Sequence, residues 1–315
     1  MILPIQFKPL YQERVWGGRE LENVYSRPLP DKTSPFGESW EITDREEAQS
    51  VVTSGNYQSS TLHELWTNHR EEIFGDNLAG DRFPILVKIL DARDDLSIQV
   101  HPPTHLAESL NGEPKTEMWY IAGCEKDAKL YVGLKNGATK ESFEASLQDG
   151  SVEQQVHAIQ PEVGDSIFIA SGRLHAIGAG FLIYEIQQNS DTTYRVFDWN
   201  RQGLDGKPRQ LHIEESMQCI DFDDFEPTMD TPSGPNNNCI SDCEHFYMEK
   251  LSLTEGASLG NPQPNRFSII TVVSGSLTDD AGVVYNAGEF LILPRNANPM
   301  TVSETAIILQ TVIPD

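Results

Sequence analysis

The chain has 315 residues and a mass of 35.2 kDa, with 38% hydrophobic and 23% charged residues. This composition can build one elaborate domain or two ordinary domains, and it excludes a disordered chain. The 48 acidic residues outnumber the 23 basic residues and give a formal net charge of −25, which argues against nucleic-acid and membrane-surface partners. A phosphorylated ligand must then be held by a few specifically placed cations.

The same sequence indicates a cytoplasmic protein. No stretch approaches the roughly 20 consecutive apolar residues of a membrane-spanning helix. The first residues, Met1 to Gln6, lack the basic and long apolar regions of a signal peptide. The four cysteines are too sparse for a disulfide framework in a chain of this length. We therefore expect a reducing compartment.

Few helices are predicted along the chain. A capping box at Thr61–Glu64 begins a helical spacing of apolar residues that ends at Gly75. Phe143 and Leu147 before Gly150 predict a second helix, and a third is predicted where apolar residues recur between 213 and 220. Elsewhere short runs of Val, Ile, Phe and Tyr alternate with turn residues, which is typical of β-strands. The fold class is therefore mainly β, closed as an antiparallel sandwich or barrel.

One strand pattern occurs twice. A strand ending at a glycine (118–123) is followed by a Gly-acid turn that opens another strand (164–169), and the pattern returns at 270–275 and 288–294. This predicts one small β-barrel module used twice. Since no histidine follows His245, only the first module can bind a metal through imidazole. We predict a metal-binding catalytic domain at 1–225, a Pro-, Gly- and Asn-rich linker at 226–244 and a second module without metal ligands at 245–315.

The segment 96–102 has an unusual alternation. Side chains alternate across a strand, so Ser97, Gln99 and His101 share one face, and Leu96, Ile98 and Val100 share the other. The simplest explanation is a barrel interior lined with functional polar groups and packed from outside by apolar ones.

Two further segments extend this polar set. Lys115 and Glu117 share a face before an apolar run, and His175 follows a Gly-x-x turn. Together, Gln99, His101, Glu117 and His175 offer an amide oxygen, two imidazoles and a carboxylate. This donor set suits zinc or another borderline divalent ion, with one position open for water or substrate.

Three cations accompany the predicted metal ligands. Lys88 interrupts an apolar run at 83–90, so it needs a buried anionic partner or must reach the surface. Lys115 lies beside Glu117, and Arg195 follows a polar stretch that begins at Glu185. A metal with several cations in an acidic protein predicts a small anionic ligand, for which a sugar phosphate fits.

These motifs, taken in order, resemble type I mannose-6-phosphate isomerase in its short bacterial form. The resemblance covers most of the chain to about residue 222, and the elements that carry it are Trp16-Gly17-Gly18, Gly37-Glu38-Ser39-Trp40-Glu41, Gln99-Val100-His101-Pro102, Lys115-Thr116-Glu117, Gly172-Arg173-Leu174-His175, Tyr194-Arg195 and Leu211-His212-Ile213. The resemblance implies two cupin-type (jelly-roll) barrels with a few short helices packed on the first. It also implies one zinc ion per chain and the interconversion of mannose 6-phosphate and fructose 6-phosphate.

The resemblance also implies residue roles. Gln99, His101, Glu117 and His175 match the zinc ligands of the family, and Arg195 matches its catalytic arginine. The remaining matches lie where the family lines its substrate pocket: Ser97, Lys88, Lys115 and Glu185. The chain lacks the long helical insertion that larger members carry between the Glu and the second ligand His.

A mechanism follows from these roles. The isomerisation passes through a cis-enediolate, which Arg195 can stabilise, while Lys88 or Lys115 with Ser97 can hold the phosphate. Glu185, a deprotonated Lys115 or a metal-bound water can each serve as the base.

Three rival functions remain at this stage. The first is a cupin isomerase for a related hexose phosphate such as glucose 6-phosphate, and the second is a non-catalytic sugar-phosphate-binding cupin. The third, an iron-dependent dioxygenase, is disfavoured because the cations indicate a phosphate ligand.

Overall fold

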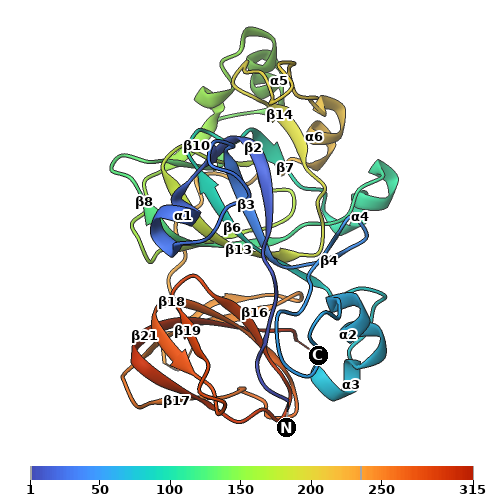
Figure 1. Cartoon of the computed structure of the whole chain (residues 1–315). Coiled ribbons are helices and arrows are strands. Elements are labelled where there is room, and N and C mark those ends of the chain that lie inside the picture. The colour runs from blue at the N-terminus through green and yellow to red at the C-terminus, as the bar shows by residue number, and fades with distance from the viewer. Residues whose placement is uncertain (1, 235, 315) are drawn as a thin grey trace. The chain divides into compact units, whose positions relative to one another are not determined.

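The computed structural model describes residues 2–234 and 236–314, and the fold is mainly β as predicted (Figure 1). The chain divides into two compact units, each built from separated segments. The terminal unit contains 1–10, 40–87 and 231–315, and the central unit contains 11–39 and 88–230. The sequence-based division into a catalytic domain (1–225), a linker (226–244) and a second module (245–315) stays a prediction.

Two antiparallel sheets form the framework of the central unit, and their arrangement is consistent with a cupin-type barrel. The first sheet has the strand order β11-β8-β13-β6-β2-β3, and the second has the order β10-β9-β12-β7-β14. The strands of the first are β2 (Leu10–Gly18), β3 (Phe36–Ile42), β6 (Ile85–Ala92), β8 (Glu117–Cys124), β11 (Ser166–Ile169) and β13 (Phe181–Gln188). The strands of the second are β7 (Ile98–Val100), β9 (Leu130–Leu134), β10 (Val156–Ile159), β12 (His175–Ile177) and β14 (Tyr194–Phe197).

The two faces of strand β7 separate a functional interior from an apolar exterior, largely as predicted. Ile98 and Val100 are fully buried in an apolar cluster that also contains Phe143 and Tyr194. Leu96 is the exception, because it packs in a different cluster, with residues from both sheets. The strand begins only at Ile98, so the alternation predicted from residue 96 does not apply before it. The prediction that Leu96 shares the outer face was therefore wrong.

Short helices accompany the central unit. Two predicted ones are confirmed: α5 (Lys140–Asp149) begins at a Thr139 capping box and ends at Gly150 with φ of 80°, and α6 (Ile213–Cys219) follows β14. The sequence analysis did not predict α1 (Glu20–Tyr25), α4 (Thr104–Ala107) or the 3₁₀ turns η1 (Glu108–Leu110) and η2 (Val152–Gln155). These elements span one or two turns, too short to display a helical period.

The terminal unit contains another large antiparallel sheet, a short strand pair and two helices. The capping box between Thr61 and Glu64 is confirmed and begins α2 (Leu62–Asn68). A break at His69, where φ is −130°, separates it from α3 (Arg70–Ile73). The sheet has the order β1-β20-β18-β21-β16-β15, with β17 and β19 paired beside it. Its strands are β1 (Ile5–Gln6), β15 (Cys239–Asp242), β16 (Tyr247–Leu253), β17 (Ser258–Leu259), β18 (Ser268–Thr278), β19 (Val284–Asn286), β20 (Phe290–Leu293) and β21 (Met300–Val312), and a separate pair joins β4 (Asp44–Arg45) to β5 (Ala48–Gln49).

The predicted internal repeat is visible in the backbone hydrogen bonds. In the central unit, Gly164 N donates to Ile121 O, and Ile121 N donates to Asp165 O. In the terminal unit, Gly288 N donates to Val272 O, and Val272 N donates to Glu289 O. In both places the Gly-acid turn closes the same antiparallel pair, β11 on β8 and β20 on β18. The two modules therefore share one local construction.

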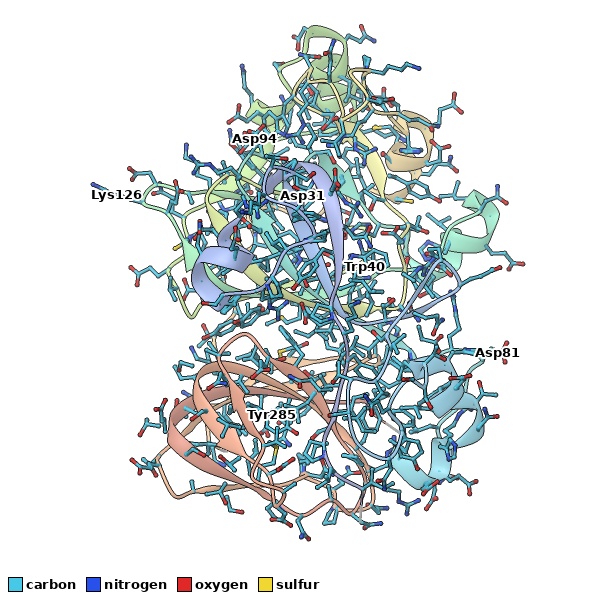
Figure 2. All side chains as sticks on the ribbon, viewed as in Figure 1. Asp31, Trp40, Asp81, Asp94, Lys126 and Tyr285 are labelled. Carbon is cyan, nitrogen blue, oxygen red and sulfur yellow. The ribbon has the colours of Figure 1, made fainter. Side chains whose placement is uncertain are left out.

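The acidic composition appears on the outside of the molecule. Asp31, Asp81 and Asp94 are exposed, whereas Tyr285 is buried within its module (Figure 2). Over residues 2–234 and 236–314, no helix combines the length and the apolar character needed to cross a bilayer.

Candidate functional site

Cross-strand pairing in the central unit brings three predicted site residues together. In the second sheet, His175 on β12 lies opposite Gln99 on β7, and Arg195 on β14 lies opposite Gln99 from the other side. Residues directly opposite each other point to the same face of a sheet. The three side chains therefore form a row, although they are up to 96 positions apart in the sequence, from Gln99 to Arg195.

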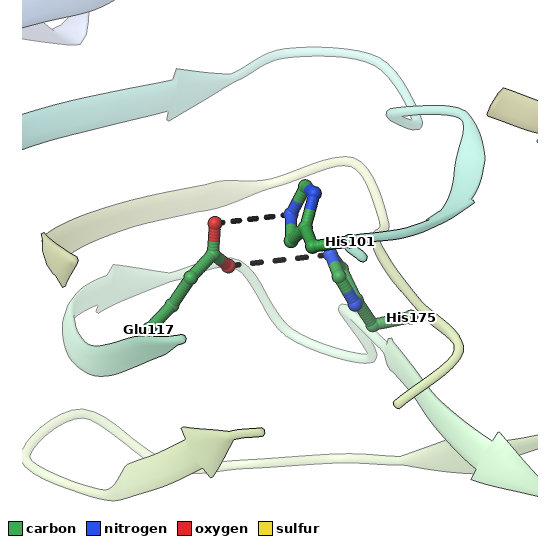
Figure 3. A group of neighbouring side chains, drawn as sticks. All are labelled: His101, Glu117 and His175. Atoms are coloured by element: carbon green, nitrogen blue, oxygen red, sulfur yellow. Dashed lines mark ion pairs between the residues drawn. The ribbon is translucent and has the colours of Figure 1, made fainter. Parts of the chain in front are cut away.

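The centre of the site is a buried group of His101, Glu117 and His175 (Figure 3). Their ligand atoms lie within 4.8 Å of one another. Glu117 Oε1 is 3.1 Å from His101 Nε2, and Glu117 Oε2 is 4.0 Å from His175 Nε2. Each of the three is only 1% exposed. Two imidazoles and a carboxylate at this spacing can hold a divalent metal ion.

The hydrogen bonds of the two histidines are those expected of metal ligands. Thr192 O lies 2.8 Å from His101 Nδ1, and Arg173 O lies 2.9 Å from His175 Nδ1. Because a carbonyl can only accept, each Nδ1 carries the proton, and each Nε2 lone pair faces Glu117. His101 Nε2 and Glu117 Oε1 are buried and make no hydrogen bond of good geometry among the described residues. A bound cation would satisfy both atoms.

Gln99, the fourth predicted ligand, lies beside this group. Its Nε2 is 3.4 Å from His175 Nε2, and its Oε1 accepts a 3.1 Å hydrogen bond from Ser97 Oγ. A half-turn of the amide would bring the oxygen toward His175. Its role as a ligand stays a prediction.

The electrostatics keep the group in the metal-binding form. Burial and the Lys115 ammonium lower the pKa of His101 to about 3, and burial also lowers the pKa of His175. Burial alone would raise the pKa of Glu117, but Lys115 and His101 hold it well below its ordinary value. Both imidazoles are therefore neutral and the carboxylate is charged, as ligation requires.

Lys88 has a buried anionic partner, which is one of the two alternatives that the sequence left open. Its Nζ lies 3.1 Å from Glu185 Oε2, and the two side chains are only 3% and 5% exposed. Burial would lower the pKa of Lys88, but Glu185 and Glu38 raise it, so it remains an ammonium. Burial and the charge of Glu117 raise the pKa of Glu185.

Trp119 joins the two buried carboxylates, and the sequence analysis missed it. Its indole Nε1 donates to Glu117 Oε2 at 3.0 Å and to Glu185 Oε1 at 3.1 Å. Residues 117 and 119 share a face of β8, and Glu185 on β13 lies opposite Trp119. The two-residue spacing from Glu117 could have revealed it. Trp119 orients both carboxylates and leaves Glu117 Oε1 toward His101.

Replacing Trp119 by Phe should weaken metal binding. The variant removes the donor from two buried carboxylates, so we expect metal affinity to fall about 10- to 100-fold and stability to fall by about 1–3 kcal/mol. Metal titration and thermal unfolding measure the two effects. The control is Trp199→Phe, because the indole of Trp199 donates to a carbonyl, that of Leu96, and to no carboxylate among the described residues. It should lose stability and keep metal affinity, and unchanged affinity in Trp119→Phe would remove this role.

A cavity of about 310 Å³ opens beside the metal-binding group within the central unit. All the residues predicted for the site line this cavity, except His101 and Glu117. Glu117 contacts two of the lining residues, Lys115 and His175, and His101 contacts Glu117. The lining residues are Arg14, Trp16, Glu38, Lys88, Leu90, Leu96, Ser97, Gln99, Lys115, Trp119, His175, Ile177, Glu185, Asp191, Thr193, Arg195, Arg209 and His212.

Arg195 is connected to the metal-binding group by hydrogen bonds. Its Nε donates to Ser97 Oγ at 3.1 Å, and Ser97 Oγ donates to Gln99 Oε1. Its Nη1 donates to Gln210 O at 3.0 Å. Burial and nearby arginines lower the pKa of Arg195 to about 10, so it stays charged at neutral pH. The guanidinium is thus held in the cavity wall.

Comparison with known proteins agrees with this geometry. The family model for the catalytic domain of type I phosphomannose isomerase matches residues 5–118. Mannose-6-phosphate isomerase ManA of Bacillus subtilis is 38% identical over 304 residues, covering 92% of this chain and 93% of that protein. The chain belongs to the type I phosphomannose isomerase family. The mannose-6-phosphate isomerase of Streptococcus mutans is 33% identical over 304 residues, covering 94% of this chain and 93% of that protein.

Structural comparison extends the family assignment to the whole fold. The crystal structure of the mannose 6-phosphate isomerase from Bacillus subtilis superimposes with a TM-score of 0.88 at 32% identity, covering 99% of this chain and 100% of that chain. The likeness therefore spans both units of this phosphomannose isomerase family member, beyond residue 222, where the motifs that carried the resemblance end.

Proposed function

We propose that the protein is a zinc-dependent isomerase that interconverts mannose 6-phosphate and fructose 6-phosphate in the cytoplasm. The observation that carries the proposal is the group of His101, Glu117 and His175, whose member His175 lines a cavity that Arg195 also lines. Family membership supports the substrate class, because the similar proteins carry the name mannose-6-phosphate isomerase.

Zinc suits the donor set of two imidazoles and a carboxylate, with Gln99 as the proposed fourth ligand. When bound, the ion would act as a Lewis acid toward the sugar oxygens. The remaining chemistry falls to side chains of this chain.

The reaction moves a proton between C2 and C1 of the sugar through a cis-enediolate, so the protein must supply a base. Glu185 is the best supported of the three candidates, because burial and the charge of Glu117 raise its pKa above its ordinary value and make the carboxylate a stronger base. Lys115 lies 3.1 Å from Glu117 Oε1, and an ion-paired ammonium has no lone pair to accept a proton. Trp119 and Lys88 hold the Glu185 carboxylate in the cavity wall.

Arg195 is the proposed electrophilic residue. A guanidinium that keeps its charge can stabilise the negative charge that develops on the enediolate. Ser97 orients it through Nε and also contacts Gln99, so the arginine and the metal-binding group face one substrate. Lys88 and Lys115 line the same cavity, where they would contact the sugar.

A coupled isomerase assay before and after chelation tests the proposal. We expect turnover of mannose 6-phosphate, its loss on chelation, and its recovery when zinc is restored. Elemental analysis of the purified protein identifies the metal. Glucose 6-phosphate serves as the alternative substrate, and preference for it would assign a related isomerase. Binding of mannose 6-phosphate without conversion would assign a non-catalytic sugar-phosphate-binding protein.

A further inference from the structure

More cations than carboxylates line the cavity, although the protein as a whole is strongly negative. Five basic side chains line it against three carboxylates: Arg14, Lys88, Lys115, Arg195 and Arg209 against Glu38, Glu185 and Asp191. In a chain with a net charge of −25, this local excess of cations marks a place for an anion. Which of these cations would bind the anion depends on the partners that each already has.

Each of the two lysines forms an ion pair with a buried carboxylate. Lys88 Nζ lies 3.1 Å from Glu185 Oε2, and Lys115 Nζ lies 3.1 Å from Glu117 Oε1. All four side chains are at most 5% exposed. A phosphate bound to either lysine would compete with a buried carboxylate and lie against its negative charge.

The arginines on the more exposed side of the cavity are less fully neutralised. Arg195 Nε and Nη1 donate to neutral acceptors, Ser97 Oγ and Gln210 O. Arg209 shares Asp198 with Arg201, and Arg201 also lies 3.4 Å from a second carboxylate, Asp94. Arg195, Arg201 and Arg209 thus have two carboxylate partners between them, so one positive charge next to the cavity is uncompensated.

Asp198 also fixes the direction of Arg209. Its Oδ2 accepts Arg209 Nε at 2.8 Å, and its Oδ1 accepts Arg209 Nη2. This contact uses one edge of the guanidinium. The other edge, through Nη1, has no hydrogen-bond acceptor among the described residues, while the side chain lines the cavity. A guanidinium held by one edge presents the other to an oxyanion.

We propose that Arg209 forms the subsite for the phosphate group of the substrate, with Asp198 as its positioning residue. This inference rests on the proposed sugar-phosphate substrate, and it assigns the phosphate to Arg209 instead of Lys88 or Lys115. Burial and then repulsion from Arg209 lower the pKa of Arg195. An anion bound by Arg209 would relieve that repulsion and leave Arg195 to the enediolate.

The test is calorimetric titration of the metal-loaded protein with inorganic phosphate. Arg209→Gln should weaken phosphate binding about 10- to 100-fold, because it removes a charge-assisted contact. It should raise the KM for mannose 6-phosphate by a similar factor with a much smaller change in kcat. Binding of unphosphorylated mannose should not change. Wild-type phosphate affinity in Arg209→Gln would overturn the assignment.

Matched variants separate the subsite from general charge and from misfolding. Lys207→Gln removes an exposed charge two positions away, which does not line the cavity, and should bind phosphate as the wild type does. Arg209→Lys keeps the charge and should bind with intermediate affinity. Asp198→Asn should weaken binding less than Arg209→Gln. An equal loss in Lys207→Gln and Arg209→Gln would overturn the subsite.

The same titration distinguishes this inference from the proposed function. A wild-type protein that binds phosphate through Arg209 but does not convert mannose 6-phosphate would retain the subsite and lose the isomerase assignment. A protein that isomerises mannose 6-phosphate while Arg209→Gln leaves KM and phosphate affinity unchanged would retain the function and lose the subsite.

Discussion

His101→Ala should purify without its metal ion and without isomerase activity. His101 contributes one of two imidazole donors, and its Nε2 is a buried atom that makes no hydrogen bond among the described residues. Loss of residues that merely orient a ligand costs about 10- to 100-fold in metal affinity, so loss of a ligand should cost more. Elemental analysis and the coupled assay on one preparation measure both effects.

The control for this variant is His105→Ala. His105 is exposed on α4, four positions from His101, and lies outside the metal-binding group. It should keep both metal and activity. Thermal unfolding of the two variants checks that the His101 variant is folded. Full metal occupancy in His101→Ala would contradict its assignment as a ligand.

The metal-binding group could be predicted because each of its residues stands in a readable local pattern. His101 and Glu117 belong to two-residue alternations, and His175 follows a glycine turn. Such patterns give the face of a side chain without knowledge of the partner strand. The order of the motifs assigned the three residues to one module. In the structure their ligand atoms lie within 4.8 Å of one another.

The rest of the site depends on which strands become neighbours. The partner of Lys88 is Glu185, on a strand nearly a hundred positions later, so the sequence left a buried pair and a surface-reaching lysine as equal alternatives. Arg209 lies in an irregular segment and lines the cavity, where Asp198 accepts its hydrogen bonds. No local periodicity marks such contacts, and the repeated turn pattern reveals a module without revealing its strand order.

Arg195→Ala should keep its metal ion and lose most of its turnover. Arg195 lies opposite Gln99 and is linked to it through Ser97, but it contributes no atom to the metal-binding group. Removal of one group that stabilises a developing oxyanion costs about 10²- to 10³-fold in kcat. Steady-state kinetics with mannose 6-phosphate, together with metal analysis, measure this result.

Two further variants establish that the loss arises from the position of the charge. Arg93→Ala removes an arginine whose ion pair with Glu125 is exposed, and it should leave kcat unchanged because exposed pairs contribute little. Arg195→Lys restores a positive charge without the paired contacts to Ser97 and Gln210, and it should recover only part of the rate. A near-wild-type kcat in Arg195→Ala would remove its catalytic role, because the reaction would then proceed without the charge that the enediolate requires.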